Sequence, residues 1–231
     1  MKLAIMQPYL FPYTGYFNLV AQVDKFVFYD DVNFIKNGWI NRNRLFLSGD
    51  VRYFTVPLSG GSPNLKIAEV KCQSQGAWSR KILESIKQSY GKAPHFNSTF
   101  DLIKEVLETN PESIAILAKR SVQMIAERLG YSTIFEQTSK IYDNSALSGM
   151  SRVIDICVKE SAHTYINLPG GKDLYDPQAF KANSIDLVFS RPGFLAYQQF
   201  DRIFQPGLSI LDVMMFNDLT ACREIIAQEV A

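Results

Sequence analysis

The chain has 231 residues, 47% of them hydrophobic and 20% charged, and its formal net charge is +1. This composition is typical of a globular protein with one sizeable core, and the near-neutral charge excludes attraction to DNA through an overall field. Apolar runs stay well short of the roughly 20 residues that cross a bilayer. Cys72, Cys157 and Cys222 lack Cys-x-x-Cys spacing, which favours reduced thiols in a cytoplasmic protein without membrane insertion.

The first quarter of the chain predicts a strand over residues 2–6, a helix over 14–22 and a second strand over 25–29. Two strands joined by a helical crossover predict a parallel pair. Residues 44–56 then predict a β-hairpin that turns at Ser48-Gly49-Asp50, and a short strand is expected over 66–70.

The middle of the chain is predicted to be helical, because apolar residues recur every fourth position from Trp78 to Tyr90. Asn110-Pro111-Glu112 predicts the start of a further helix, whose apolar stripe ends at Gly130. Later segments follow the same rules: strands at 133–135, 164–167 and 185–189, a helix over about 150–161, and a short helix after a capping box at Ser209.

Together these elements predict an α/β protein, folded as a single domain over residues 1–231. Its core would be a parallel, Rossmann-like sheet, distantly similar to that of nucleotidyltransferases. The helices near residues 75–130 would form a lid or sub-lobe.

The loop after the first strand is rich in proline and tyrosine, and it lies where α/β proteins place ligands. Backbone N–H groups at the start of the following helix would bind a phosphate, and a rigid structural turn is the alternative. In placement the loop is similar to the His-x-Gly-His loop of nucleotidyltransferases, with tyrosines in place of both histidines, which argues against adenylyl transfer. The candidate substrate-binding residues are Gln7, Tyr9, Tyr13, Thr14, Gly15 and Tyr16.

Asp30 and Asp31 end the second predicted strand. A carboxylate there would hold a divalent cation, orient a sugar hydroxyl or take a proton from an amine, and capping of the next turn is the structural alternative. Only one of the two is expected to face the site, because side chains alternate along extended backbone. We predict Asp30, Asp31 and Lys36 as catalytic residues and no metal site, since neither histidine has zinc-ligand spacing.

Residues 39–44 combine an aromatic plane, amides and guanidinium groups, a set that suits a sugar-containing, negatively charged ligand. Alternation would place Trp39, Asn41 and Asn43 on one face and Arg42 on the other. A solvated basic turn is the alternative. We predict Trp39, Asn41, Arg42 and Asn43 as substrate-binding residues.

A glycine-rich turn follows the predicted strand at 164–167, where backbone groups can bind an anion. It lacks the spacing of a phosphate-binding Walker loop, and turn geometry explains it equally well. Asn167, Gly170, Gly171 and Tyr175 complete the predicted substrate-binding residues.

The segments at 1–17, 24–32, 38–44, 165–176 and 208–213 resemble those of the WbqC-like family, over nearly the whole chain. That resemblance implies a bacterial protein of O-antigen or other surface-polysaccharide gene clusters. It also implies an acyl- or aminoacyltransferase, with glycyl transfer suggested, that acts on the amine of a dTDP- or UDP-linked amino sugar.

Several alternatives remain open. The Asp pair would also serve a nucleotidyl- or glycosyltransferase, and a non-catalytic nucleotide-sugar-binding protein would need no nucleophile–base pair. No cofactor is fixed by the sequence, and ATP with Mg²⁺ or another activated acyl donor would serve. Aminoacyl-tRNA as donor is disfavoured by the near-neutral charge. The oligomeric state is left open, with a homodimer as one possibility.

Overall fold

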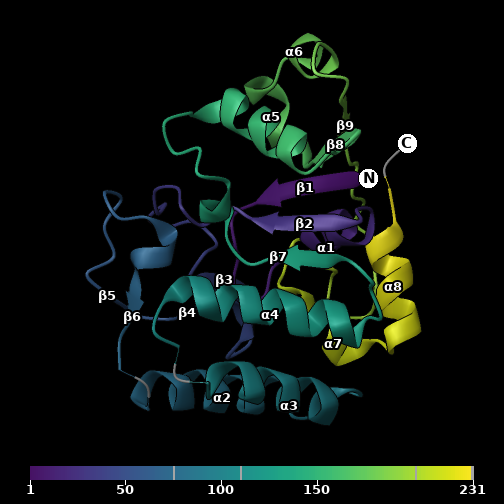
Figure 1. Ribbon diagram of the computed structural model, residues 1–231. Helices are drawn as coiled ribbons and strands as arrows, with labels where there is room; N and C mark the ends of the chain where they lie inside the picture. Colours follow the sequence, from purple (N-terminus) through teal and green to yellow (C-terminus); the bar gives the residue numbers. More distant parts are fainter. Residues whose placement is uncertain (75, 110, 201, 230–231) are drawn as a thin grey trace.

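The computed structural model describes residues 1–74, 76–109, 111–200 and 202–229, and a five-stranded parallel sheet lies at its centre (Figure 1). Its strands are β1 (Lys2–Met6), β2 (Lys25–Phe28), β7 (Ile134–Glu136), β8 (Thr164–Asn167) and β9 (Asp186–Phe189), in the spatial order β7-β2-β1-β8-β9. Every neighbouring pair is parallel. The predicted α/β class is therefore confirmed, and the winding of the chain reverses between β1 and β8.

Helices cover both faces of this sheet. Ala4 and Phe26 face α1 (Thr14–Ala21) and α4 (Ile114–Arg128) in one apolar cluster, whereas Leu3 and Val27 face α5 (Gly149–Lys159) and α6 (Pro177–Lys181) in another. Adjacent strand residues point to opposite faces, so both faces become buried. This is why the strands read as nearly continuous apolar runs.

Two more helices, α2 (Ala77–Tyr90) and α3 (Phe96–Leu107), lie beyond α4, and α7 (Ile210–Phe216) and α8 (Leu219–Ala227) close one side of the molecule (Figure 1). Apolar residues of α2 and α3 belong to the same cluster as those of α4. The core therefore continues from the sheet into these helices. That α2 and α3 move as a lid stays a prediction. None of the described helices is long and apolar enough to cross a membrane.

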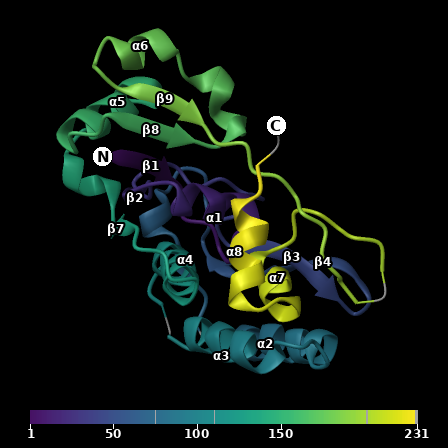
Figure 2. The same ribbon diagram turned by 90° about the vertical axis from the view of Figure 1, so that its right-hand side faces the viewer.

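The hairpin of β3 (Arg42–Leu47) and β4 (Asp50–Thr55) turns at Ser48 and Gly49, which both have positive φ, as the sequence predicts. Figure 2 shows it beside the long connection between β9 and α7. That connection is tied to the hairpin by hydrogen bonds from Arg202 to the Gly49 carbonyl and from Arg44 to the Gly207 carbonyl.

Two sequence predictions need correction. Residues 66–70 form mainly a 3-10 turn (Ile67–Glu69), because the Glu69 carboxylate accepts a hydrogen bond from the Lys66 N–H; the short strands β5 (Leu58–Ser59) and β6 (Lys71–Cys72) flank this region. Helix α4 begins at Ile114, with Ser113 as its N-cap, and not at Pro111; Asn110 lies outside the described residues. The Ser113 hydroxyl accepts the Ile116 N–H, which gives this end a cap that Pro111 cannot provide.

Candidate functional site

A cavity of about 850 Å³ lies at the carboxyl ends of β1, β2 and β8. Gln7 follows β1, Tyr29 follows β2 and Asn167 ends β8, and all three line it. The arrowheads of β1 and β2 point towards this end of the sheet in Figure 1. Ligands of open parallel sheets bind where the winding reverses, and this volume is within the usual range for small-molecule sites.

The lining of the cavity is aromatic and electrically neutral. Six aromatic side chains contribute to it: Tyr9, Tyr13, Tyr29, Trp39, Tyr175 and Phe194. Among the described residues that line it there is no Asp, Glu, Lys, Arg or His. Burial raises the pKa of each of the four lining tyrosines, so their hydroxyls stay protonated at neutral pH.

Two amide side chains supply most of the remaining polarity. The Asn167 Oδ1 accepts the Leu168 N–H at 2.8 Å, which fixes the orientation of the amide. Its Nδ2 lies against Gly171, since a Cβ added there would be 2.6 Å away. Gln7 holds its loop through a carbonyl that accepts the Tyr16 hydroxyl at 2.9 Å, and within the described part of the chain its own side-chain amide has no hydrogen-bond partner.

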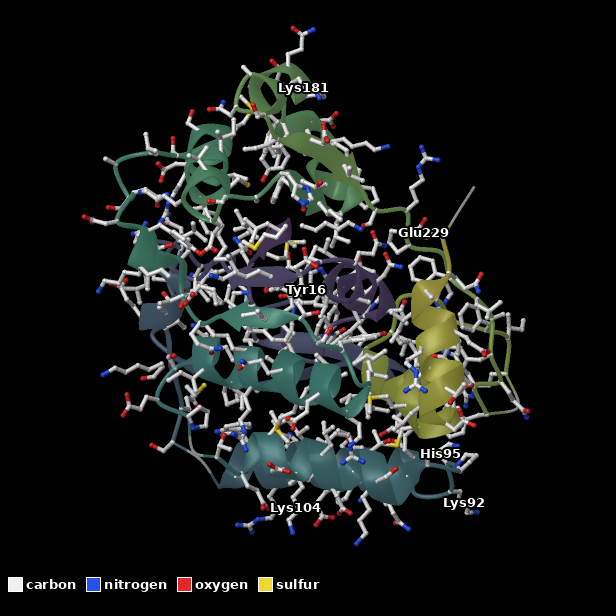
Figure 3. The ribbon with its side chains drawn as sticks, turned by 45° about the vertical axis from the view of Figure 1, so that its right-hand side comes forward. Tyr16, Lys92, His95, Lys104, Lys181 and Glu229 are labelled. Atoms are coloured by element: carbon white, nitrogen blue, oxygen red, sulfur yellow. The ribbon has the colours of Figure 1, made fainter. Side chains whose placement is uncertain are left out.

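The first helical residues of α1, Thr14, Gly15 and Tyr16, are buried and do not line this cavity. Tyr13 occupies the N-cap position of the helix, and its ring covers Gly15, where an added Cβ would lie 2.4 Å from the ring. Thr14 is 7% exposed. Tyr16 is fully buried in the interior, as Figure 3 shows, and burial raises its pKa well above the ordinary value. The phosphate contact expected at Thr14 and Gly15 stays a prediction without support from this geometry.

Asp30 lies outside the cavity lining, in a closed polar cluster at the end of β2. Its carboxylate is 2% exposed and forms a 2.6 Å ion pair with Lys119 from α4. It also accepts hydrogen bonds from the Thr138 hydroxyl and the Ser139 N–H. A carboxylate that accepts hydrogen bonds from three donors, one on α4 and two on the segment after β7, serves to join these elements.

Asp31 forms an ion pair with Arg152 of α5 and a hydrogen bond with Ser139. Arg152 is 4% exposed, and its guanidinium lies 5.0 Å from the centre of the Tyr29 ring. Asp31 therefore borders the cavity through Arg152 and Tyr29 and does not line it. The catalytic roles of Asp30 and Asp31 stay predictions.

The structure separates the residues predicted from the 36–43 segment. Trp39 lines the cavity, whereas Lys36, Asn41 and Arg42 line a different cleft of about 320 Å³. Asn43 is buried and donates to the Leu10 carbonyl at 3.1 Å and to the Phe11 carbonyl at 2.8 Å.

The Arg42 side chain is already engaged within the protein. It donates to the carbonyls of Gly38 and Asn37 and lies 4.3 Å from the centre of the Tyr53 ring. Strand β3 begins only at Arg42, so the alternation expected from Trp39 onward does not hold before it.

The cavity thus brings together Gln7, Tyr9, Tyr13, Trp39, Asn167, Gly170, Gly171 and Tyr175 from the predicted set. Sequence reasoning missed Tyr29, which directly follows a strand and could have been found by that position, and Phe194, for which the sequence has no comparable signal. No group of three His, Cys, Asp or Glu side chains suited to a metal ion occurs in the described ranges.

These features define an α/β protein with a neutral, aromatic cavity at the reversal point of a parallel sheet. The chain belongs to the WbqC-like protein family, whose model matches residues 7–224. It is 31% identical over 220 residues to a protein of Mycobacterium tuberculosis (strain ATCC 25618 / H37Rv) described as "Uncharacterized protein Rv1507c", a match that covers 94% of this chain and 93% of that one. No solved structure shows a significant match.

Proposed function

We propose that the protein is an acyl- or aminoacyltransferase, with glycyl transfer as one form, that acts on the amine of a nucleotide-linked amino sugar. The observation that carries this proposal is the large cavity lined by aromatic rings and amides and by no charged side chain among its described residues. The family resemblance supports a role in surface-polysaccharide biosynthesis. The strands follow one another outward from β1, through β2 to β7 on one side and through β8 to β9 on the other, which supports a Rossmann-like core. The relation to nucleotidyltransferases stays a prediction.

A neutral cavity suits an amine nucleophile, because only the unprotonated amine attacks a carbonyl. Transfer of an ammonium group from water into such a cavity is unfavourable, so desolvation lowers the pKa of the amine. The flat faces of Tyr9, Tyr13 and Trp39 offer contact area to the sugar ring. The amine would therefore bind in its reactive form without a carboxylate base in the lining.

The same cavity offers hydrogen-bond donors for the developing oxyanion. Attack of the amine nitrogen forms the new C–N bond, and the carbonyl oxygen gains negative charge until the donor's leaving group departs with its electron pair. The amine proton then passes to the leaving group or to solvent. The Asn167 Nδ2, the Gln7 amide and protonated tyrosine hydroxyls are the donors available to that oxygen.

A nucleotidyl- or glycosyltransferase built on Asp30 and Asp31 has less support. Lys119 and Arg152 already neutralise the two carboxylates, and neither carboxylate lines the cavity. The acyl donor is left open between an adenylate formed from ATP and Mg²⁺, a thioester and an aminoacyl-tRNA.

The test is to incubate the protein with dTDP- and UDP-linked amino sugars and each donor class, and to measure acylated product by mass spectrometry. Asn167→Ala should lower turnover, whereas Asn97→Ala, an exposed amide on α3, should not. Sugar binding without product from any donor would indicate a non-catalytic binding protein. Absence of both binding and product would overturn the proposal.

A further inference from the structure

The charge distribution around the cavity determines which part of a nucleotide sugar it can hold. A diphosphate carries negative charge that is costly to bury without a cation or several donors. Within the described lining there is no basic side chain to meet it. The amino sugar and the acyl group, in contrast, match the rings and amides in polarity.

Three basic side chains at this end of the sheet are already engaged within the protein. Arg152 is held by Asp31, and Lys119 by Asp30. Arg42 donates to backbone carbonyls and lines the separate cleft. Recruiting any of these groups to a phosphate would break an interaction that the fold uses.

Exposed apolar side chains are part of the cavity wall. Ile35 is 53% exposed, Leu174 69% and Phe194 51%, and each also lines the cavity. They come from three separate connections: the one after β2, the 3-10 turn after β8 and the one after β9.

Lys172 and Arg191 are exposed and adjoin lining residues in the sequence. Exposed cations in water contribute little to binding.

We infer that the protein recognises the amino sugar itself and not its nucleotide carrier, with the sugar inside the cavity and the diphosphate left in solvent at its entrance. This inference rests on the proposed function and specifies which part of the substrate the protein binds. Carriers with different bases, or a simple methyl group in place of the nucleotide, are then accepted at similar affinity.

Calorimetric titration tests the inference. The probes are the dTDP- and UDP-linked amino sugars used above, the methyl glycosides of the same sugars, and UDP and dTDP alone. A nucleotide sugar and its methyl glycoside should bind within about tenfold of each other, whereas UDP and dTDP should bind at least about tenfold more weakly. Raising the salt concentration from about 50 to about 300 mM should change the dissociation constants by less than about threefold.

Three outcomes would overturn the inference. UDP or dTDP could bind as tightly as the intact nucleotide sugar, the affinity could fall steeply with salt, or Arg42→Ala could weaken the nucleotide sugar and not the methyl glycoside. Each of these results is compatible with the proposed transferase activity and would mean that the site also recognises the nucleotide. If no nucleotide-linked amino sugar binds and none is acylated, the proposed function itself fails, and the inference fails with it.

Discussion

The guanidinium of Arg152 lies 5.0 Å from the centre of the Tyr29 ring and thereby connects a buried ion pair with the wall of the cavity. Arg152 pairs with Asp31, and its Nε donates to the Asn144 Oδ1 at 2.8 Å. Burial raises the pKa of Tyr29, while the positive charge of Arg152 opposes that shift. The end of β2 is thus held by α5, and this contact fixes one aromatic side of the site.

Arg152→Met should destabilise the protein by about 3 kcal/mol, because it leaves the carboxylate of Asp31 in a mostly buried position without its cation. Denaturant unfolding followed by circular dichroism measures the loss. Adding Asp31→Asn to this variant should restore part of the stability, since no charge is then left unpaired.

Lys181→Met is the matched control, because Lys181 pairs with Asp186 at 3.0 Å but both side chains are more than half exposed. Figure 3 shows Lys181 at the outer end of the molecule. The expected loss is less than about 1 kcal/mol. Equal losses from the two substitutions would contradict the importance assigned to burial of the Arg152 pair.

Tyr90→Phe should cost about 2–3 kcal/mol of unfolding free energy, because it removes two buried hydrogen bonds at once. The Tyr90 hydroxyl donates to the Asp212 Oδ1 at 2.6 Å and accepts the Phe46 N–H at 3.0 Å. Tyr53→Phe, whose parent side chain is 48% exposed, should change stability by less than about 0.5 kcal/mol. Urea unfolding of both variants gives the comparison, and a Tyr90→Phe variant as stable as Tyr53→Phe would show that the network contributes little.

Local sequence rules predict the elements better than the partners of individual side chains. Apolar strands mark the parallel sheet, and Ser48-Gly49 marks the hairpin turn, because both depend on neighbouring residues. The ion pair of Asp30 depends on Lys119, 89 residues away, which no local pattern reveals. Asn43 has the residue type of a ligand-binding amide, yet the fold uses it to hold the loop after β1.

Asp212 is fully buried, and burial raises its pKa above the ordinary value of 3.8, although hydrogen bonds from Tyr197, Tyr90 and Gln199 oppose the shift. The native state then binds this proton more tightly than the unfolded state. The stability that Asp212 contributes is complete below about pH 4 and is lost as the pH rises through the native pKa.

Asp212→Asn, which cannot titrate, isolates this effect of pH. Its stability loss relative to the wild type should be largest near pH 4 and smaller at about pH 7. Chemical unfolding at a series of pH values measures the difference between the two proteins. A loss that stays constant or grows with pH would mean that the Asp212 pKa is not raised in the native state.

Gly171→Ala should displace the side-chain amide of Asn167, because the added Cβ would lie 2.6 Å from the Asn167 Nδ2 and 3.2 Å from the Tyr175 ring. The amide must move, so its side-chain NMR signals should shift and amino-sugar binding should weaken by about fivefold or more. Gly170→Ala is the matched control on the same turn, since nothing lies within 4 Å of its added Cβ. If both variants bind the sugar equally well, the position of the Asn167 amide does not determine affinity, and its assigned contact with the substrate is wrong.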